Sequence, residues 1–273
     1  MPEVVHWNPV AWRRASQRGL GRLIPIRKGV RNFGDLLGPL IVARLRQQLS
    51  LGRESDPNSR LLAVGSIMRL AAPGDVVWGA GINGKTMQGV TFPVLDVRAV
   101  RGPLTAQTLR AHGNTVPDTY GDPALLIPRL WTEEELGVSR RSQGVVLMPN
   151  YNDIRDWPEN ALSPLGNPLK KIRALASADV VIASSLHAII IAEAFGVPTI
   201  LVRSSKETLF KYEDYYLGTG RELPQVAPNW RAALDWTPTP PLTNWDPRPL
   251  IASFPSDLWQ SSARGRQAQT DSE

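Results

Sequence analysis

Short apolar runs that alternate with helical patterns constrain the fold of this 273-residue chain more than any other feature. Each run is bounded by glycine, proline or polar residues, and most lead into a stretch with helical periodicity. Parallel strands need such a crossover between them, so the pattern predicts an α/β fold with parallel sheets. In such sheets ligands bind beyond the carboxyl ends of the strands.

The helical stretches have start and stop signals at their ends. A helix is expected over residues 35–48, with Asp35 at its N-cap position, and another over residues 103–111, ended by Gly113. Two more are expected in the second half, at residues 169–176 and 186–195. The predicted strands are residues 61–64, 76–78, 97–100, 145–148, 179–183 and 199–202.

The strand and helix pattern restarts after a polar stretch near residues 139–144, which predicts two doubly wound, Rossmann-like domains that face a cleft. The N-terminal domain is expected to span residues 1–140 and the C-terminal domain residues 141–260. The proline-rich residues 237–249 indicate an extended connector. Residues 261–273 have no apolar pattern and predict a disordered tail.

Composition excludes several classes of site. The chain has no cysteine, which rules out disulfides, thiol nucleophiles and cysteine zinc sites, and its three histidines lack zinc-binding spacing. It has neither an apolar stretch of about 20 residues nor a signal-peptide core, so we expect a cytoplasmic protein. Nine tryptophans are explained most simply by burial, although such rings also occur on carbohydrate-binding surfaces.

The positive charge is uneven, with a net charge of +6 and a basic segment at residues 13–31 that contains no acid. Such a segment can be a solvated loop or attract nucleic acid, anionic lipid or an anionic substrate. No nucleic-acid-binding module accompanies it, so we expect no nucleic-acid partner. Peripheral contact with the inner face of the membrane stays open. The basic residues are Arg13, Arg14, Arg18, Arg22, Arg27, Lys28 and Arg31.

Two glycine-containing turns could bring backbone N–H groups to a ligand. Asn32, Gly34 and Asp35 open the first helix, where free N–H groups favour an anion, although an ordinary helix start explains them equally well. Gly79 and Gly81 follow a strand and would allow close backbone approach, but a tight turn alone is the simpler reading. The GxGxxG spacing at residues 79–84 lacks the helix of a dinucleotide site.

Two arginines stand at the end of the strand predicted at residues 97–100. Arg101 follows the strand directly and precedes a helix, and its planar fork suits a carboxylate or a phosphate. A surface arginine is the alternative. Strand alternation puts Arg98 on the opposite face, so it ranks below Arg101 as an anion contact.

The strongest candidate site is the turn formed by Ser184, Ser185, Leu186 and His187. Either serine can cap the following helix, and His187 lies in its first turn. The helix N-terminus disfavours the imidazolium form, so a neutral imidazole is available for proton transfer near pH 7. A histidine satisfied within the core is the alternative. Lys211, among aromatic and acidic residues, reads as an anion contact or a salt bridge.

Six segments in this order resemble the polysaccharide pyruvyl transferase family, especially its bacterial exopolysaccharide members. They are NFGD at 32–35, WGAG at 78–81, VRGPLTA at 100–106, GDPALLIP at 121–128, SSLHAIIIAEAFGVP at 184–198 and FKYEDYY at 210–216. The resemblance implies a fold similar to GT-B glycosyltransferases and phosphoenolpyruvate as donor. It also implies a saccharide acceptor, free or lipid-linked, that gains a cyclic pyruvate ketal while phosphate leaves, with no metal and no nucleotide cofactor.

Carried onto this chain, the resemblance assigns the family's histidine to His187 and its anion-binding arginine to Arg101. Lys211 matches a basic residue that often precedes the DY pair. Ala188 stands where many relatives have glycine, and Gly102 where some have aspartate. With His187 and Arg101 as catalytic residues, the expected substrate-binding residues are Asn32, Gly34, Asp35, Gly79, Gly81, Arg98, Ser184, Ser185, Leu186 and Lys211.

Ketal formation needs a proton on the donor's methylene carbon, so that a sugar hydroxyl can attack the adjacent carbon. His187 is the titratable residue best placed for this step. Two alternatives stay open from the residues: a GT-B-type glycosyltransferase that uses a nucleotide sugar, and a non-catalytic saccharide-binding protein. The first usually needs a charged cluster for the nucleotide diphosphate, and the second does not explain His187 and Arg101 at strand ends.

Overall fold

The computed structural model describes residues 2–14, 25–52, 58–85, 89–139 and 144–259. The side chains of residues 11–28, which carry most of the basic segment, lie outside the described part of the chain. So do the predicted tail at 261–273 and residues 140–143 at the predicted domain boundary.

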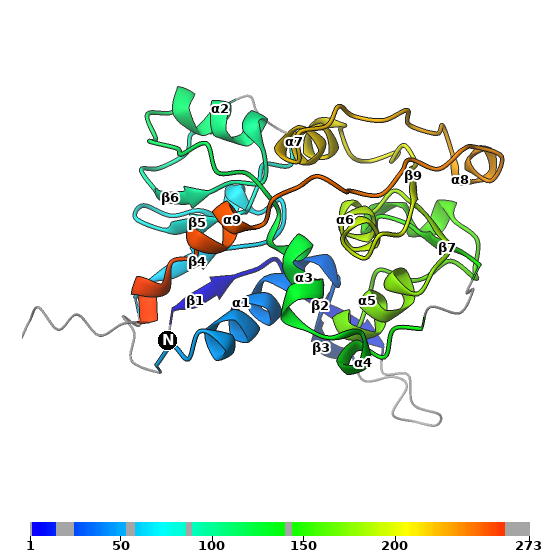
Figure 1. The fold of residues 1–273 in the computed structure, drawn as a ribbon, viewed down its shortest axis with the longest axis horizontal. Coiled ribbons are helices and arrows are strands. Elements are labelled where there is room, and N and C mark those ends of the chain that lie inside the picture. The colour runs from blue at the N-terminus through cyan, green and yellow to red at the C-terminus, as the bar shows by residue number, and fades with distance from the viewer. Residues whose placement is uncertain (1, 15–24, 53–57, 86–88, 140–143, 260–273) are drawn as a thin grey trace, which may run out of the picture.

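The first half of the chain forms a four-stranded parallel sheet in the order β1 (Glu3–Val5), β4 (Arg60–Leu62), β5 (Val76–Trp78) and β6 (Asp96–Ala99) (Figure 1). The strand β5 is buried along its whole length, as parallel sheets covered on both faces require. Two helices pack with this sheet, α1 (Leu37–Gln48) and α2 (Pro103–Ala111).

The second half forms a three-stranded parallel sheet of β7 (Val145–Met148), β8 (Val180–Ala183) and β9 (Thr199–Leu201). Its main helices are α5 (Pro168–Ala176) and α6 (Leu186–Ala194). Most residues of α6 are buried, because this helix lies in the interior rather than on the surface.

The predicted strands and helices are confirmed, with ends that move by one or two residues. The largest difference lies at the first helix. A 3₁₀ turn, η2 (Gly34–Leu36), precedes α1, and the Asp35 side chain caps neither element. Its carboxylate instead accepts a hydrogen bond from Asn32, so the N-cap prediction for Asp35 was wrong.

Several elements were not predicted because their sequence signals are weak. The strand β1 is only three residues long, and the antiparallel pair of β2 (Val10–Arg14) and β3 (Pro25–Gly29) overlaps the basic segment. Between the two sheets the chain forms η4 (Pro123–Leu126), followed by the short helices α3 (Ile127–Leu130) and α4 (Glu133–Leu136).

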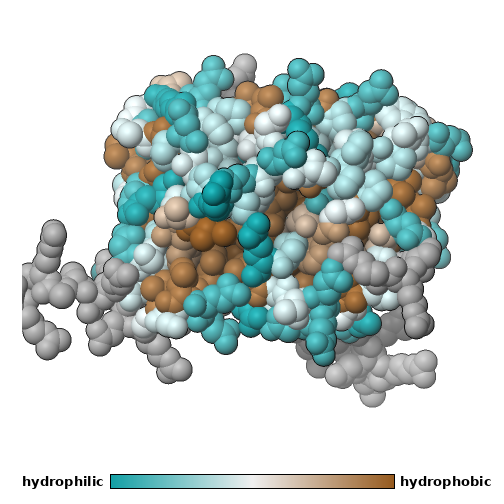
Figure 2. Space-filling model, viewed as in Figure 1, coloured by the Kyte–Doolittle hydropathy of each residue, from teal (hydrophilic) through white to brown (hydrophobic). Residues whose placement is uncertain are grey.

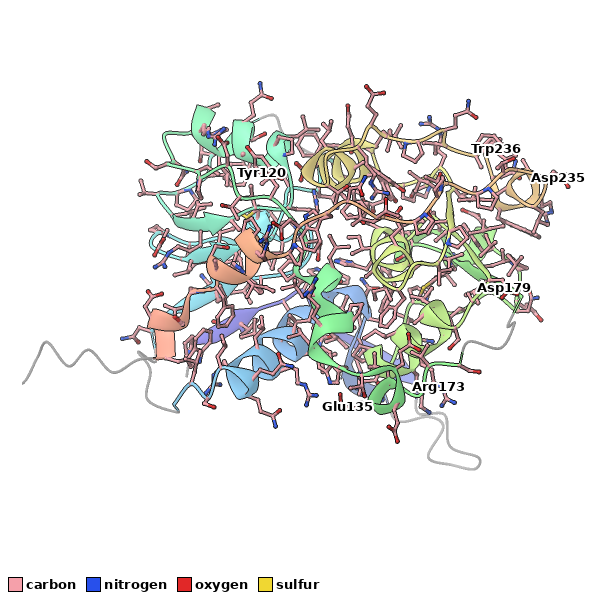
Figure 3. All side chains as sticks on the ribbon, in the orientation of Figure 1. Tyr120, Glu135, Arg173, Asp179, Asp235 and Trp236 are labelled. Carbon is pink, nitrogen blue, oxygen red and sulfur yellow. The ribbon has the colours of Figure 1, made fainter. Side chains whose placement is uncertain are left out.

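One continuous apolar core connects the two sheets. It runs from Leu61 and Trp78 in the first sheet, through Leu126 in η4, to Ala183 and Ile189 in the second sheet and α6. Side chains fill the space between the halves, while charged residues such as Glu135 on α4 and Arg173 on α5 lie at the periphery (Figure 3).

The C-terminal part of the chain returns to the first sheet. After α7 (Phe210–Gly218) and α8 (Trp230–Ala233), the connector runs alongside β9, where Thr239 pairs with Thr199, and reaches α9 (Arg248–Ala252) and η6 (Ser256–Trp259) (Figure 1). There the Trp78 indole donates to the Leu250 carbonyl at 2.9 Å. Residues 248–259, which the predicted boundary assigns to the second domain, thus pack against the first sheet.

The face seen in Figure 1 is mostly polar, with apolar side chains gathered over α1 and α9 (Figure 2). Within the described ranges, none of the helices has the length and apolar character needed to cross a membrane.

Because the C-terminal segment packs against the first sheet, we expect truncation of the Leu250 side chain to destabilise the protein strongly. This side chain is fully buried, so Leu250→Ala should lower the free energy of unfolding by about 2–5 kcal/mol through lost burial and a residual cavity. Leu234→Ala is the control, because Leu234 is 54% exposed and should change stability by about 0.5 kcal/mol or less. Urea unfolding measures both, and equal small effects would show that the segment does not hold the first sheet.

Candidate active site

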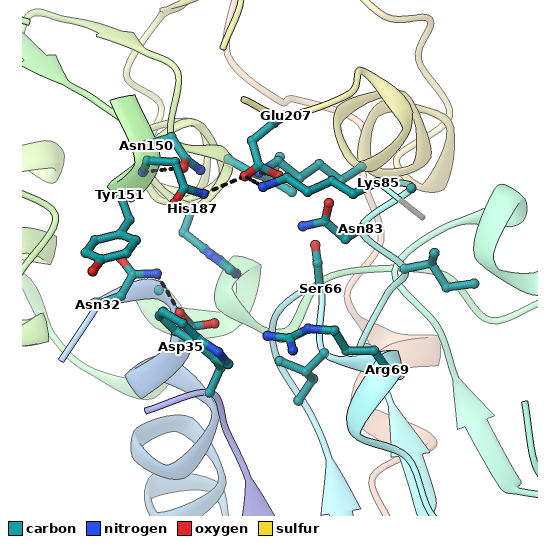
Figure 4. Close-up of a pocket in the computed structure, with 18 of the residues that line it drawn as sticks. Asn32, Asp35, Ser66, Arg69, Asn83, Lys85, Asn150, Tyr151, His187 and Glu207 are labelled. Atoms are coloured by element: carbon teal, nitrogen blue, oxygen red, sulfur yellow. Dashed lines mark hydrogen bonds and ion pairs between the residues drawn. The ribbon is translucent and has the colours of Figure 1, made fainter. Parts of the chain in front are cut away.

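A cavity of about 490 Å³ lies between the two sheets, beyond the carboxyl ends of their strands. Loops that follow β1, β4, β5, β7, β8 and β9 supply its wall, as expected for a ligand site in parallel α/β sheets. Figure 4 shows His187 projecting into this space from one side and Asp35 from another. Of the residues expected at the site, those that line the cavity are Asn32, Gly34, Asp35, Ser185, Leu186, His187 and Lys211.

His187 is held between a glycine and a buried carboxylate. Its Nε2 lies 3.6 Å from Oδ2 of Asp122, and neither atom has a hydrogen-bond partner in the described part of the chain. The other Asp122 oxygen accepts from the Ala124 N–H at 2.9 Å, so the carboxylate is fixed by the start of η4. Asp122 is fully buried and His187 is 13% exposed, so Asp122 can orient the ring without reaching the cavity.

Gly34 makes room for the imidazole. A Cβ atom at this position would lie 2.4 Å from Nδ1 of His187, a distance that real contacts do not allow. Nδ1 thus faces Gly34, which lines the cavity, whereas Nε2 is buried and turned toward Asp122. The NFGD segment therefore lies directly against the catalytic candidate.

Asp35 is the second titratable group near His187. Its Oδ2 accepts from the Asn32 side chain at 2.5 Å. Burial raises the pKa of Asp35, and this outweighs the Asn32 hydrogen bond and the positive groups His187, Lys211 and Arg69, which act in the opposite direction. A carboxyl group with a raised pKa keeps its proton closer to neutral pH, so Asp35 can act as an acid in this cavity.

Cations gather at one end of the cavity (Figure 4). Lys211 bonds Glu207 at 3.1 Å, Lys85 forms a second ion pair with the same carboxylate, and Asn152 donates to it at 2.9 Å. Burial lowers the pKa of Lys211, although Glu207 opposes this. Burial alone would raise the pKa of Glu207, but Lys211, Lys85 and Asn152 outweigh it and lower that pKa.

Arg69 is a third cation at the cavity, and Figure 4 shows it below Ser66, apart from Lys85 and Glu207. Its side chain is exposed and lines the cavity, and it has no acidic partner in the part of the chain that the structure describes. It is therefore available to an anionic ligand without breaking an existing ion pair.

Arg101 lies behind the cavity wall rather than in the cavity, which corrects its expected placement. It is 0% exposed, its Nε donates to Oδ2 of Asp214 at 3.0 Å, and Nη2 forms an ion pair with the same oxygen at 2.9 Å. Nη1 donates to the Ser66 hydroxyl at 2.8 Å and Nη2 to the Ile82 carbonyl at 2.7 Å. Since Ser66 and Ile82 line the cavity, Arg101 positions the wall.

Four other expected residues also lie outside the cavity. Gly81 leaves room for the Arg101 guanidinium, which a Cβ would approach to 2.4 Å, and Gly79 packs against Pro123. Arg98 bonds Asp96 and Asp257 at the surface, on the opposite face that strand alternation predicts. Ser184 is buried, and its hydroxyl donates to Asp153 at 2.8 Å; neither Ser184 nor Ser185 caps α6 through its side chain.

Sequence reasoning missed several residues of this site. Asp122 could have been found by the same strand-end criterion as His187, because Tyr120 pairs in parallel with Val100 and Asp122 follows this bridge. Glu207 follows the end of β9 in the same way. The roles of Lys85 and Arg69 depend on loops whose paths have no local signature. Trp7 and Tyr151 were also missed: Figure 4 shows Tyr151 on the side of the cavity away from Lys85, and Trp7 packs against Tyr151.

Comparison with known families decides the relationship. The sequence model of polysaccharide pyruvyl transferase matches residues 2–206. The chain belongs to the polysaccharide pyruvyl transferase family. The match includes His187, Asp122 and Asp35, while Lys211 lies beyond its end.

A second comparison identifies a sequence relative. The chain is 30% identical over 200 residues to the succinoglycan biosynthesis protein ExoV of Rhizobium meliloti (strain 1021), which covers 67% of this chain. The chain spans 60% of the length of that relative. No solved structure matches.

The buried position of Arg101 predicts a structural role that can be measured. Arg101→Ala should cost about 3–5 kcal/mol of unfolding free energy, because it leaves Asp214 buried without its partner. Arg98→Ala removes a partly exposed ion pair and should cost about 1 kcal/mol or less. Chemical denaturation separates the two. An Arg101→Ala protein of normal stability with impaired anion binding would return Arg101 to the ligand site.

Asp35 predicts a pH-dependent stability cost. Because its pKa is raised in the native state, the folded protein binds this proton more tightly than the unfolded chain, and stability falls as pH rises through the raised pKa. Asp35→Asn removes this cost, so the gain in Tm over wild type should grow from acidic to neutral pH.

Asp118→Asn is the control with the opposite sign, since Tyr120 and then Arg110 lower the pKa of the exposed Asp118. Ionised Asp118 stabilises the native state as pH rises, so the Tm of wild type should be slightly higher than that of Asp118→Asn at neutral pH. A Tm difference for Asp35→Asn that does not change with pH would contradict the raised pKa of Asp35.

Proposed function

We propose that this chain transfers pyruvate from phosphoenolpyruvate to a sugar of an exopolysaccharide precursor, forming a pyruvate ketal and releasing phosphate. The observation that carries this proposal is the cavity in which His187, backed by buried Asp122, lies beside Asp35 and faces three cations. Family membership and the similarity to a succinoglycan biosynthesis protein support the same reaction class.

The cationic end suits the donor. Phosphoenolpyruvate carries a phosphate and a carboxylate, which need positive groups held in fixed positions. Arg69 is free of an acidic partner among the described residues, whereas Lys85 and Lys211 share the Glu207 carboxylate. A bound donor would compete with Glu207 for the two lysines, and Arg101 would hold Ser66 and Ile82 in place from behind.

The proton balance of the reaction requires two exchanges. Two sugar hydroxyls each lose a proton as their oxygens bond to the central carbon of the donor. One proton converts the methylene group to a methyl group, and the other leaves with phosphate. An acid and a base that act twice, in opposite directions, complete the reaction and return to their starting states.

Asp35 and His187 fit these two roles. Protonated Asp35 donates to the methylene carbon while His187 accepts the proton of the first hydroxyl, which attacks the adjacent carbon. The imidazolium then protonates the departing phosphate, and the Asp35 carboxylate accepts the proton of the second hydroxyl as the ring closes. Asp122 lies 3.6 Å from Nε2 and is the group that we propose to orient the ring, so the proton transfers take place at Nδ1.

Several finer features belong to the same proposal. We propose that the transfer uses no metal and no nucleotide cofactor, that the fold is related to GT-B glycosyltransferases, and that the enzyme works in the cytoplasm. Contact of the basic segment at 13–31 with an anionic membrane would bring the enzyme to a lipid-linked acceptor.

His187→Gln tests the proposal directly. Removing a general acid–base group should lower the rate of phosphate release in the presence of acceptor by about 10²–10⁴-fold, with donor binding largely retained. Asp122→Asn should also lower the rate, since it weakens control of the ring orientation. His6→Gln is the control, because His6 does not line the cavity and its ring bonds the carbonyl of Val4.

Donor binding is measured separately by thermal stability with phosphoenolpyruvate or a UDP-sugar. A ligand at 100 times its Kd stabilises a protein by about 2.7 kcal/mol. We expect phosphoenolpyruvate to raise the thermal stability and the UDP-sugar to leave it unchanged. Stabilisation by the UDP-sugar alone, or normal turnover of His187→Gln, would contradict the proposed reaction.

A further inference from the structure

The end of the cavity opposite the lysines has a different chemistry. It is formed by Trp7, in the loop after β1, and Tyr151, at the start of η5 (Tyr151–Asp156) after β7. The two ring centroids lie 5.8 Å apart at an interplanar angle of 61°. Figure 4 shows Tyr151 on the side of the cavity away from Lys85 and Glu207, with Asn32 and Asp35 close to it.

Both rings line the cavity and remain partly exposed. Trp7 packs its inner side against the apolar core of the first sheet, and its outer side borders the cavity. Burying such rings against a ligand would remove further apolar surface from water. An apolar, partly exposed aromatic corner beside catalytic groups is typical of ligand pockets.

Polar groups in this corner lack protein partners. The Trp7 indole N–H, the Tyr151 hydroxyl and the side-chain nitrogen of Asn150 (Nδ2) form no hydrogen bond with any described residue. At the opposite end, by contrast, the side chains of Lys211, Glu207 and Asn152 bond one another. The aromatic corner thus presents rings together with free donors. Around Tyr151, Figure 4 labels no lysine or arginine.

We propose that the Trp7–Tyr151 corner is the acceptor subsite and binds an uncharged pyranose at the end of a glycan. The C–H face of the sugar packs on the rings, and its hydroxyls bond the free donors. Two hydroxyls then point toward Asp35 and His187, between the acceptor and the donor at the cationic end. This inference rests on the proposed function and adds the place and chemical class of the acceptor.

The test combines kinetics with binding of a neutral probe. Trp7→Ala should raise the acceptor KM by about 5- to 10-fold through loss of the aromatic contact, with the phosphoenolpyruvate KM unchanged. Trp7→Phe retains a ring and should recover most of the affinity. Tyr151→Phe loses only the hydroxyl and should raise the acceptor KM by about 2- to 10-fold. Trp230→Ala, on α8 outside this cavity, is the matched control and should change neither constant.

Calorimetric titration with neutral oligosaccharides that end in glucose or galactose, without donor, separates failure of the subsite from failure of the proposed reaction. Weaker binding to Trp7→Ala and Trp7→Phe in rank order, but not to Trp230→Ala, supports the subsite even if phosphoenolpyruvate gives no turnover. Equal binding to all variants, or no binding to wild type, overturns it. An unchanged acceptor KM in both Trp7→Ala and Tyr151→Phe also overturns it and leaves the transferase proposal intact.

Discussion

The buried ion pair of Arg101 and Asp214 is the interaction on which the site depends. It joins the end of a strand in the first sheet to α7, which follows the last strand of the second. Such a pair is stable only when its remaining polar atoms are satisfied, and here Thr105 donates to both Asp214 oxygens while Arg101 also bonds Ser66 and Ile82. The packing leaves no room for a Cβ atom at three glycines, because Gly102 and Gly218 face backbone atoms and Gly81 faces the Arg101 guanidinium.

The Arg101–Asp214 pair determines which side chains line the cavity. The loops held by Arg101 form its wall, and α7 brings Lys211 to the Glu207 carboxylate. On the other side, α6 places His187 between Gly34 and Asp122, so segments from both halves meet at one imidazole. The result is a cationic end, an aromatic end and two titratable groups between them, which together suit one anionic and one neutral substrate.

The sequence predicted the strands, the main helices and the importance of strand ends, because apolar periodicity and capping signals are local. It could not show that Arg101 pairs with Asp214, since the two are far apart in the chain and only the fold brings them together. The same limit applies to Asp122 as the partner of His187 and to the return of Leu250 to Trp78. Asp35 was misassigned as a cap because Asn32, three residues earlier, competes for its carboxylate.

The central claim is that protonation of the donor's methylene carbon accompanies attack by sugar hydroxyls in this cavity. The most direct measurement is the reaction of the purified protein with phosphoenolpyruvate and a saccharide acceptor in D₂O, with the product examined by NMR and mass spectrometry. We expect a cyclic ketal whose methyl group carries a single deuterium from solvent, formed in step with phosphate release. A product that retains the methylene group as an enol ether, or release of phosphate with no pyruvyl group on the sugar, would contradict the account.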